Sequence, residues 1–133
     1  MTGAEAWSAG GCHCGRIRFE ARGRPTRVFV CNCSICTRKG YLHWIVPRDD
    51  VRVLAGADDL VEYRFGTGVA RHLFCPVCAC APFYVPRSDP DKLDVNARCL
   101  DDISLVGLEQ VPFDGQDWER TYERYRRVER GDP

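Results

Sequence analysis

The sequence lacks an excess of charge of either sign. Its 133 residues include 19 Lys and Arg and 19 Asp and Glu, for a formal net charge of +0, and no block of like charge occurs along the chain. Binding to a phosphate backbone requires clustered Lys and Arg side chains. We therefore expect no nucleic-acid partner.

Long apolar runs are also missing. The longest stretches, such as residues 41–47, are far too short to span a bilayer. The first residues, MTGAEAWSAGG, have neither the basic n-region nor the apolar h-region of a signal peptide. We therefore expect a cytoplasmic protein with no membrane partner.

Internal repeats, low-complexity segments and Ser/Gly linkers are absent as well. The composition is 44% hydrophobic and 11% aromatic, which provides enough apolar surface for a folded core. We expect a single domain over residues 1–133, with its core at about residues 9–119. The exposed strand edges of such a domain would allow a homodimer.

Short segments of alternating apolar and polar residues predict strands, because side chains alternate between the two faces of a sheet. These segments are residues 16–21, 27–30, 41–46, 51–54, 60–65, 69–74, 83–85 and 93–97. The predicted fold class is mainly β.

One segment, residues 117–130, has the spacing of an amphipathic helix. Trp118, Tyr122, Tyr125 and Val128 would share one face, with Asp117 as the N-cap and Gly131 as the stop. We expect this C-terminal helix to pack its aromatic side chains onto the sheets.

Nine cysteines are the most informative feature of the chain. In a reducing compartment, closely spaced thiols hold metal ions more often than they form disulfides. The cysteines fall into the groups Cys12-His13-Cys14, Cys31-Asn32-Cys33-Ser34-Ile35-Cys36, Cys75-Pro76-Val77-Cys78-Ala79-Cys80 and the single Cys99. Thiolate-rich sets select zinc, with iron in a four-thiolate site as the alternative.

A structural zinc site requires four ligands, which Cys12, Cys14, Cys75 and Cys78 could supply as two converging pairs. Three ligands would remain on one short loop, Cys31, Cys33 and Cys36, and three protein ligands are typical of a reactive zinc with an open position. The spacing alone fits another division equally well, in which Cys31 or Cys36 joins Cys75 and Cys78.

The order of GGCHCG, CNCSIC, FCPVC, NARCLDD and FDGQDWE resembles the glutathione-dependent formaldehyde-activating enzyme family, most closely its branch that includes centromere protein V. The resemblance extends from Gly10 to about Glu119. It implies a β-tent fold of small antiparallel sheets around two zinc sites. It also implies the same division of ligands, with Cys12, Cys14, Cys75 and Cys78 structural and Cys31, Cys33 and Cys36 of the reactive type.

The activity that the resemblance implies is a carbon–sulfur lyase reaction, the joining of formaldehyde to the co-substrate glutathione as S-(hydroxymethyl)glutathione. A zinc bound by three thiolates is electron-rich, so water activation is disfavoured, whereas an incoming thiol would be held for attack on a small aldehyde. The alternative is a zinc-binding interaction module without catalytic activity.

Four further residues carry specific expectations. Arg38 and Lys39 follow Cys36 directly and are candidate contacts for glutathione carboxylates, although solvated basic side chains on a loop would have the same pattern. Ala79 stands where family members usually have Gly, so we expect a strained or altered turn. Cys80 is either an extra ligand of the second zinc or a buried free thiol.

The three histidines are weaker candidates for a catalytic role than the cysteines. His13 should point away from a metal that Cys12 and Cys14 share. His43 and His72 lie in predicted strands, where a satisfied structural histidine is the more common outcome and a role in proton transfer the alternative.

Overall fold

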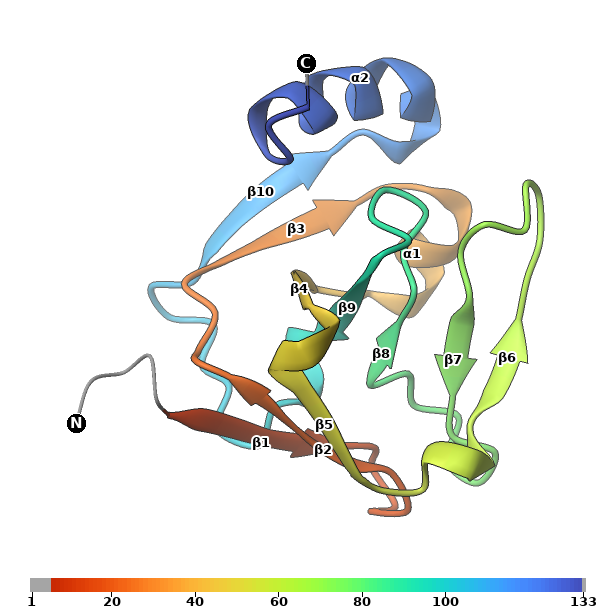
Figure 1. Cartoon of the computed structure of the whole chain (residues 1–133), viewed down its shortest axis with the longest axis vertical. Helices are drawn as coiled ribbons and strands as arrows, with labels where there is room; N and C mark the ends of the chain where they lie inside the picture. Colours follow the sequence, from red (N-terminus) through yellow and green to blue (C-terminus); the bar gives the residue numbers. More distant parts are fainter. Residues whose placement is uncertain (1–5, 133) are drawn as a thin grey trace.

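Short strands in three sheets form most of the chain, of which the computed structural model describes residues 6–132 (Figure 1). The strands are β1 (Trp7–Gly11), β2 (Arg18–Arg22), β3 (Arg27–Cys31), β4 (His43–Pro47), β5 (Val51–Ala55), β6 (Val61–Tyr63), β7 (His72–Phe74), β8 (Phe83–Tyr84), β9 (Lys92–Asn96) and β10 (Glu109–Phe113). The helices are α1 (Ser34–Lys39) and α2 (Trp118–Val128). Short 3-10 turns connect several of these elements.

The sheets have the orders β1-β2-β5, β10-β3-β4-β9-β8 and β6-β7. Neighbouring strands are antiparallel except for β10 and β3, which run parallel. A parallel pair needs a long connection that returns the chain to the same end of the sheet. Here the connection from β9 to β10 brings the C-terminal part of the chain to the edge next to β3 (Figure 1).

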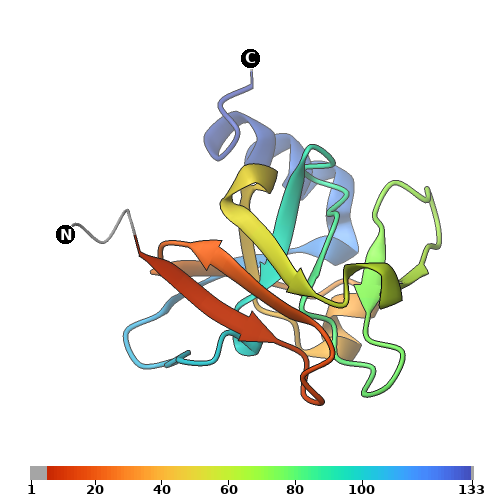
Figure 2. The ribbon, with the colours of Figure 1, turned by 60° about the horizontal axis from the view of Figure 1, so that its bottom comes forward.

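The main core lies between the three-stranded and the five-stranded sheets, and Figure 2 shows the first of these sheets in front. On β2, Phe19 and Ala21 are fully buried, whereas the arginines that flank them reach the surface. The Phe19 ring meets Phe83 of β8 edge-on, with ring centroids 5.6 Å apart. Alternation along β2 thus supplies the apolar face that joins the two sheets.

Helix α2 lies across β10 and β3 (Figure 1) and is anchored by Tyr125. The Tyr125 ring contacts Phe29 and Phe113 edge-on, at centroid distances of 5.7 and 5.9 Å. Its hydroxyl donates a hydrogen bond of 2.6 Å to Asp89, which is fully buried and also pairs with Arg130. The helix is therefore held by apolar contacts and by a buried carboxylate.

The mainly β class, the small sheets and the short C-terminal helix are confirmed. Asp117 is the N-cap residue, as predicted, but its side chain makes no capping hydrogen bond. The predicted place of Val128 on the buried face is wrong, since Val128 is 70% exposed. The sequence did not reveal β1, β10 or α1. Strand β1 contains Ser8, Ala9 and two glycines, β10 contains Pro112, and α1 has only six residues, so none carries a strong periodic pattern.

Within residues 6–132, no helix is both long enough and apolar enough to cross a membrane.

Candidate metal centres

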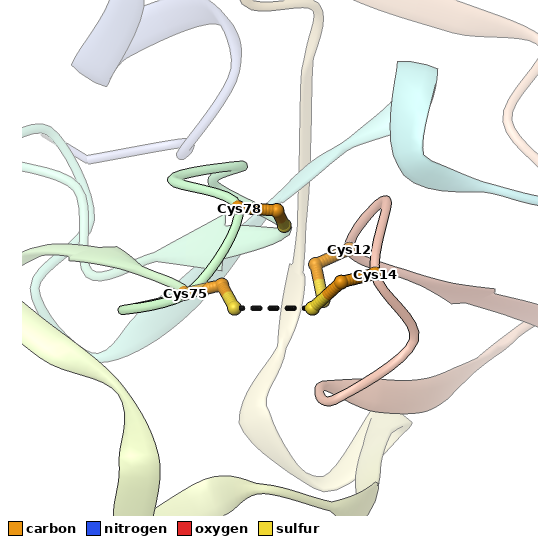
Figure 3. A group of neighbouring side chains, drawn as sticks. All are labelled: Cys12, Cys14, Cys75 and Cys78. Carbon is orange, nitrogen blue, oxygen red and sulfur yellow. Dashed lines mark hydrogen bonds between the residues drawn. The ribbon is translucent and has the colours of Figure 1, made fainter.

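The first cysteine cluster joins two turns that are far apart in the sequence. Cys12 and Cys14 lie in the turn from β1 to β2, and Cys75 and Cys78 lie in the turn that follows β7 (Figure 3). All four sulfur atoms lie within 4.8 Å of one another, and the Cys14 sulfur is 3.6 Å from those of Cys12 and Cys75. This is a four-sulfur set from two converging pairs.

Backbone N–H groups point at the sulfur atoms of the first cluster. The Ile17 N–H donates to Cys12 Sγ at 3.2 Å, and the Val77 N–H donates to Cys75 Sγ at 3.4 Å. Backbone donors from Cys14 and Cys80 lower the pKa of Cys78 to about 5. Thiolates are the form that binds metal, so these donors and the four sulfurs fit a closed tetrahedral zinc site.

The turn between Cys75 and Cys78 ends on a strained residue. Ala79 has φ +65°, and it is the one non-glycine residue with positive φ in the described part of the chain. Its N–H donates to the Cys75 carbonyl at 2.9 Å, which closes the turn. The left-handed conformation expected at this position is therefore present, and it is adopted by an alanine.

Replacing Ala79 by Gly should stabilise the protein, because a left-handed alanine costs roughly 1–2 kcal/mol and part of this is offset by the greater freedom of glycine when unfolded. We expect a net gain of about 0.5–1 kcal/mol in the free energy of unfolding, measured by urea denaturation of the zinc-loaded protein. Ala81→Gly, outside the turn, should lower stability instead. Equal stability of wild type and Ala79→Gly would show that the turn is not strained.

The second cluster is local. Cys31 ends β3, Cys33 is the N-cap of α1 and Cys36 lies in the first turn of that helix, so Cys33 and Cys36 share one helix face. Their three sulfur atoms lie within 4.8 Å of one another. The Cys36 N–H points at Cys33 Sγ at 3.5 Å. Hydrogen bonds from the Cys31 thiol and then the Cys36 thiol lower the pKa of Cys33 to about 2.

The second cluster lines a cavity of about 540 Å³. The end of β3, α1, the loop after β6, strands β4, β7 and β8, and the start of α2 all contribute to its wall. Much of the wall is aromatic, supplied by Phe29, Phe65, Tyr84, Phe113, Trp118 and Tyr125. Its size and largely apolar lining are those of a small-molecule site.

The three sulfurs of the second cluster and its N–H donor fit a zinc with three protein ligands. No fourth His, Cys, Asp or Glu of the described residues joins this group. Cys80 belongs to neither group; its side chain packs against the main core, and its carbonyl accepts from the Cys75 N–H at 2.9 Å. All nine cysteines are free thiols, so none of the described sulfurs is used in a disulfide.

The basic residues that could contact a substrate carboxylate differ in whether they line the cavity. Arg38 is exposed and donates to the Ser34 carbonyl of its own helix at 2.9 Å, and neither it nor Lys39 lines the cavity. Arg87 does line it, stacked 3.6 Å from the Trp118 ring centroid and paired with Glu119 at 2.7 Å. Arg87 was not among the residues predicted from the sequence, because nothing in the sequence around it signals that this segment returns to the cysteines.

Two histidines line the cavity. His43 is buried and pairs with Asp94, and His72 is buried between the rings of Phe65 and Tyr84. Burial, followed by the nearby charge of Lys39, lowers the pKa of His72 to about 4, so His72 is neutral near pH 7. His13 is exposed and, as expected, belongs to neither sulfur group.

The small mainly β domain thus has two clusters of convergent cysteine sulfurs that could each hold a metal ion, one with four sulfurs and one with three beside a cavity. The chain matches the glutathione-dependent formaldehyde-activating enzyme family over residues 8–120, and it belongs to that family. A crystal structure of a Rhodobacter sphaeroides protein has a similar fold, with a TM-score of 0.71 and 34% sequence identity. The similarity covers 78% of this chain and 97% of that protein.

Proposed function

We propose that this protein is a zinc-dependent carbon–sulfur lyase-type enzyme that handles adducts of glutathione, or a related small thiol, with small aldehydes such as formaldehyde. The observation that carries the proposal is the placement of Cys31, Cys33 and Cys36 on the wall of the 540 Å³ cavity. Family membership supports the same reaction class, although membership alone does not establish an activity.

Each part of the site has a role in this proposal. Cys31, Cys33 and Cys36 would hold the zinc, which when bound would supply a position for a further thiol in its deprotonated form. These cysteines lie at the cavity wall, where the aromatic side chains provide a largely apolar lining. Arg87 offers a positive charge for a substrate carboxylate, since among the described residues it is the one Lys or Arg that lines the cavity.

A zinc at the second cluster would have the reactive role, and a zinc at the first cluster would have a structural role. The first cluster has four protein sulfurs and therefore no open position, whereas the second has three. The protein would then hold two zinc ions per chain. Its partners would be a small thiol and a small aldehyde, in a cytoplasmic setting where glutathione is abundant.

Native mass spectrometry tests the proposal by counting zinc ions and glutathione molecules on the purified chain. We expect two zinc ions and one glutathione, and we expect Cys33→Ser to lose one zinc and the glutathione together. Cys80→Ser is the matched control, because Cys80 lies outside both sulfur groups and should change neither count.

The zinc-loaded protein that binds glutathione should also speed the exchange between free formaldehyde and its glutathione adduct, which two-dimensional exchange NMR measures. Two zinc ions with no glutathione binding and no acceleration would contradict the enzyme proposal. They would favour the zinc-binding interaction module instead.

A further inference from the structure

A histidine and an aspartate form a buried pair at the cavity wall. His43 of β4 and Asp94 of β9 lie on adjacent strands of the five-stranded sheet, where His43 pairs with Asn96 in the register, and His43 Nδ1 lies 2.7 Å from Asp94 Oδ2. Their side chains are 5% and 1% exposed. The Tyr84 hydroxyl lies 3.3 Å from the same nitrogen, and the Tyr41 hydroxyl donates to the Asp94 carbonyl at 2.8 Å.

Two polar atoms of this pair have no partner. Among the described residues, His43 Nε2 and Asp94 Oδ1 are the buried side-chain atoms that make no hydrogen bond. Leaving such atoms unpaired is costly, and it occurs where a site is prepared for a ligand or for catalysis. A neutral imidazole whose Nδ1–H donates to a carboxylate carries its free lone pair on Nε2. The pair therefore offers an unused proton acceptor.

The same cavity contains the pair and the reactive-type cysteines. His43 and Asp94 line it together with Cys31, Cys33 and Cys36. Tyr84 of β8 lies between the two groups: its ring meets the His43 ring edge-on at a centroid distance of 5.8 Å, and its pKa is raised first by burial, then by the charge of Asp94 and next by that of Cys36. The histidine–aspartate pair and the sulfur cluster thus line one substrate-sized space.

We propose that His43, positioned by Asp94, is the general acid–base of this site; the inference rests on the function proposed above. In adduct formation the thiol sulfur bonds to the aldehyde carbon, and the electron pair of the C=O π bond moves to oxygen. His43 Nε2 accepts the proton that the thiol releases and delivers it to that oxygen. The sum is one thiol and one aldehyde giving one hydroxyalkyl thioether, with no oxidant or reductant, and the reverse reaction uses the same groups.

The groups around His43 fit this role. Asp94 supplies the negative charge that orients Nδ1–H and stabilises an imidazolium, as carboxylates paired with histidine do. Burial raises the pKa of Tyr84 and of Tyr41 well above the usual value, so both hydroxyls stay protonated. His72, the other histidine at the cavity, is neutral near pH 7 and adds no competing charge.

NMR of the ¹⁵N-labelled, zinc-loaded protein tests the proton arrangement without any turnover. Long-range ¹H–¹⁵N spectra should show His43 with a protonated Nδ1 and an unprotonated Nε2, assigned by loss of the signals in His43→Gln. Asp94→Asn should abolish this preference for one tautomer. A protonated Nε2 in the wild type would overturn the inference, because that nitrogen could not then accept a proton from the thiol.

Kinetics test the transfer itself in the glutathione–formaldehyde exchange assay. His43→Gln should lower kcat by about 100-fold, in the range of general acid–base catalysis, with KM and both zinc ions retained. His13→Gln is the matched control, because His13 is exposed and does not line the cavity. An active wild type with an equally active His43→Gln would overturn the proton role alone. A wild type that binds glutathione and formaldehyde but does not speed their exchange would remove the proposed function and the proton role together.

Discussion

Gly115→Ala is expected to empty the second cysteine cluster without altering any ligand. A methyl group added at Gly115 would lie 2.5 Å from Cys31 Sγ and 2.7 Å from Cys33 Cβ, closer than real Cβ contacts allow. The turn that carries Gly115 cannot easily retreat, because Asn32 pairs with Asp114 and with the Gln116 N–H at 3.0 and 3.1 Å. The cysteine sulfurs must move instead, and the three-sulfur geometry is lost.

The measurement is zinc content by native mass spectrometry, with an expected fall from two ions to one and a loss of glutathione binding. Gly107→Ala is the control. Gly107 has φ +77° and open space around it, so alanine there should destabilise the fold through backbone strain and leave both zinc ions in place. Retention of two zinc ions by Gly115→Ala would show that the turn yields more easily than its hydrogen bonds indicate.

Cys75→Ser should remove the first zinc and lower the stability of the whole domain much more than Cys33→Ser. A zinc at the first cluster links the turn around Cys14 to the turn around Cys75, 61 residues away, whereas a zinc at the second cluster links residues of one short loop. Closing a longer loop removes more conformational entropy from the unfolded chain. Cys75 is also fully buried in the main core, where a serine hydroxyl would be left without a partner.

Calorimetry of the two variants should show a fall in Tm of about 15 °C for Cys75→Ser, corresponding to a loss of roughly 4 kcal/mol, and a much smaller fall for Cys33→Ser. A chelator titration provides a second test, because the wild type should unfold only when zinc is removed from the first site. If Cys33→Ser were the more destabilised variant, the division into a structural and a reactive site would be reversed.

The sequence alone was sufficient to predict the features that depend on residues close together in the chain. Alternation along β2 places Phe19 and Ala21 on one face wherever the strand lies, so the strand and its buried face were predictable. The Cys-x-x-Cys spacing likewise brings Cys33 and Cys36 together whether the segment forms a turn or, as observed, the first turn of a helix. The strain at Ala79 was expected from the resemblance, because family members usually have Gly at this position, and the positive φ of Ala79 agrees with it.

Only the tertiary structure decided which distant segments meet. Spacing left open whether Cys75 and Cys78 join Cys12 and Cys14 or the other group, and the packing of the β1–β2 turn beside the turn after β7 settles it (Figure 3). The same holds for the pairing of His43 with Asp94 across 51 residues and for the approach of Gly115 to Cys31. Local patterns determine which face a side chain occupies, whereas strand order and register, set by the packing of whole sheets, determine what that face meets.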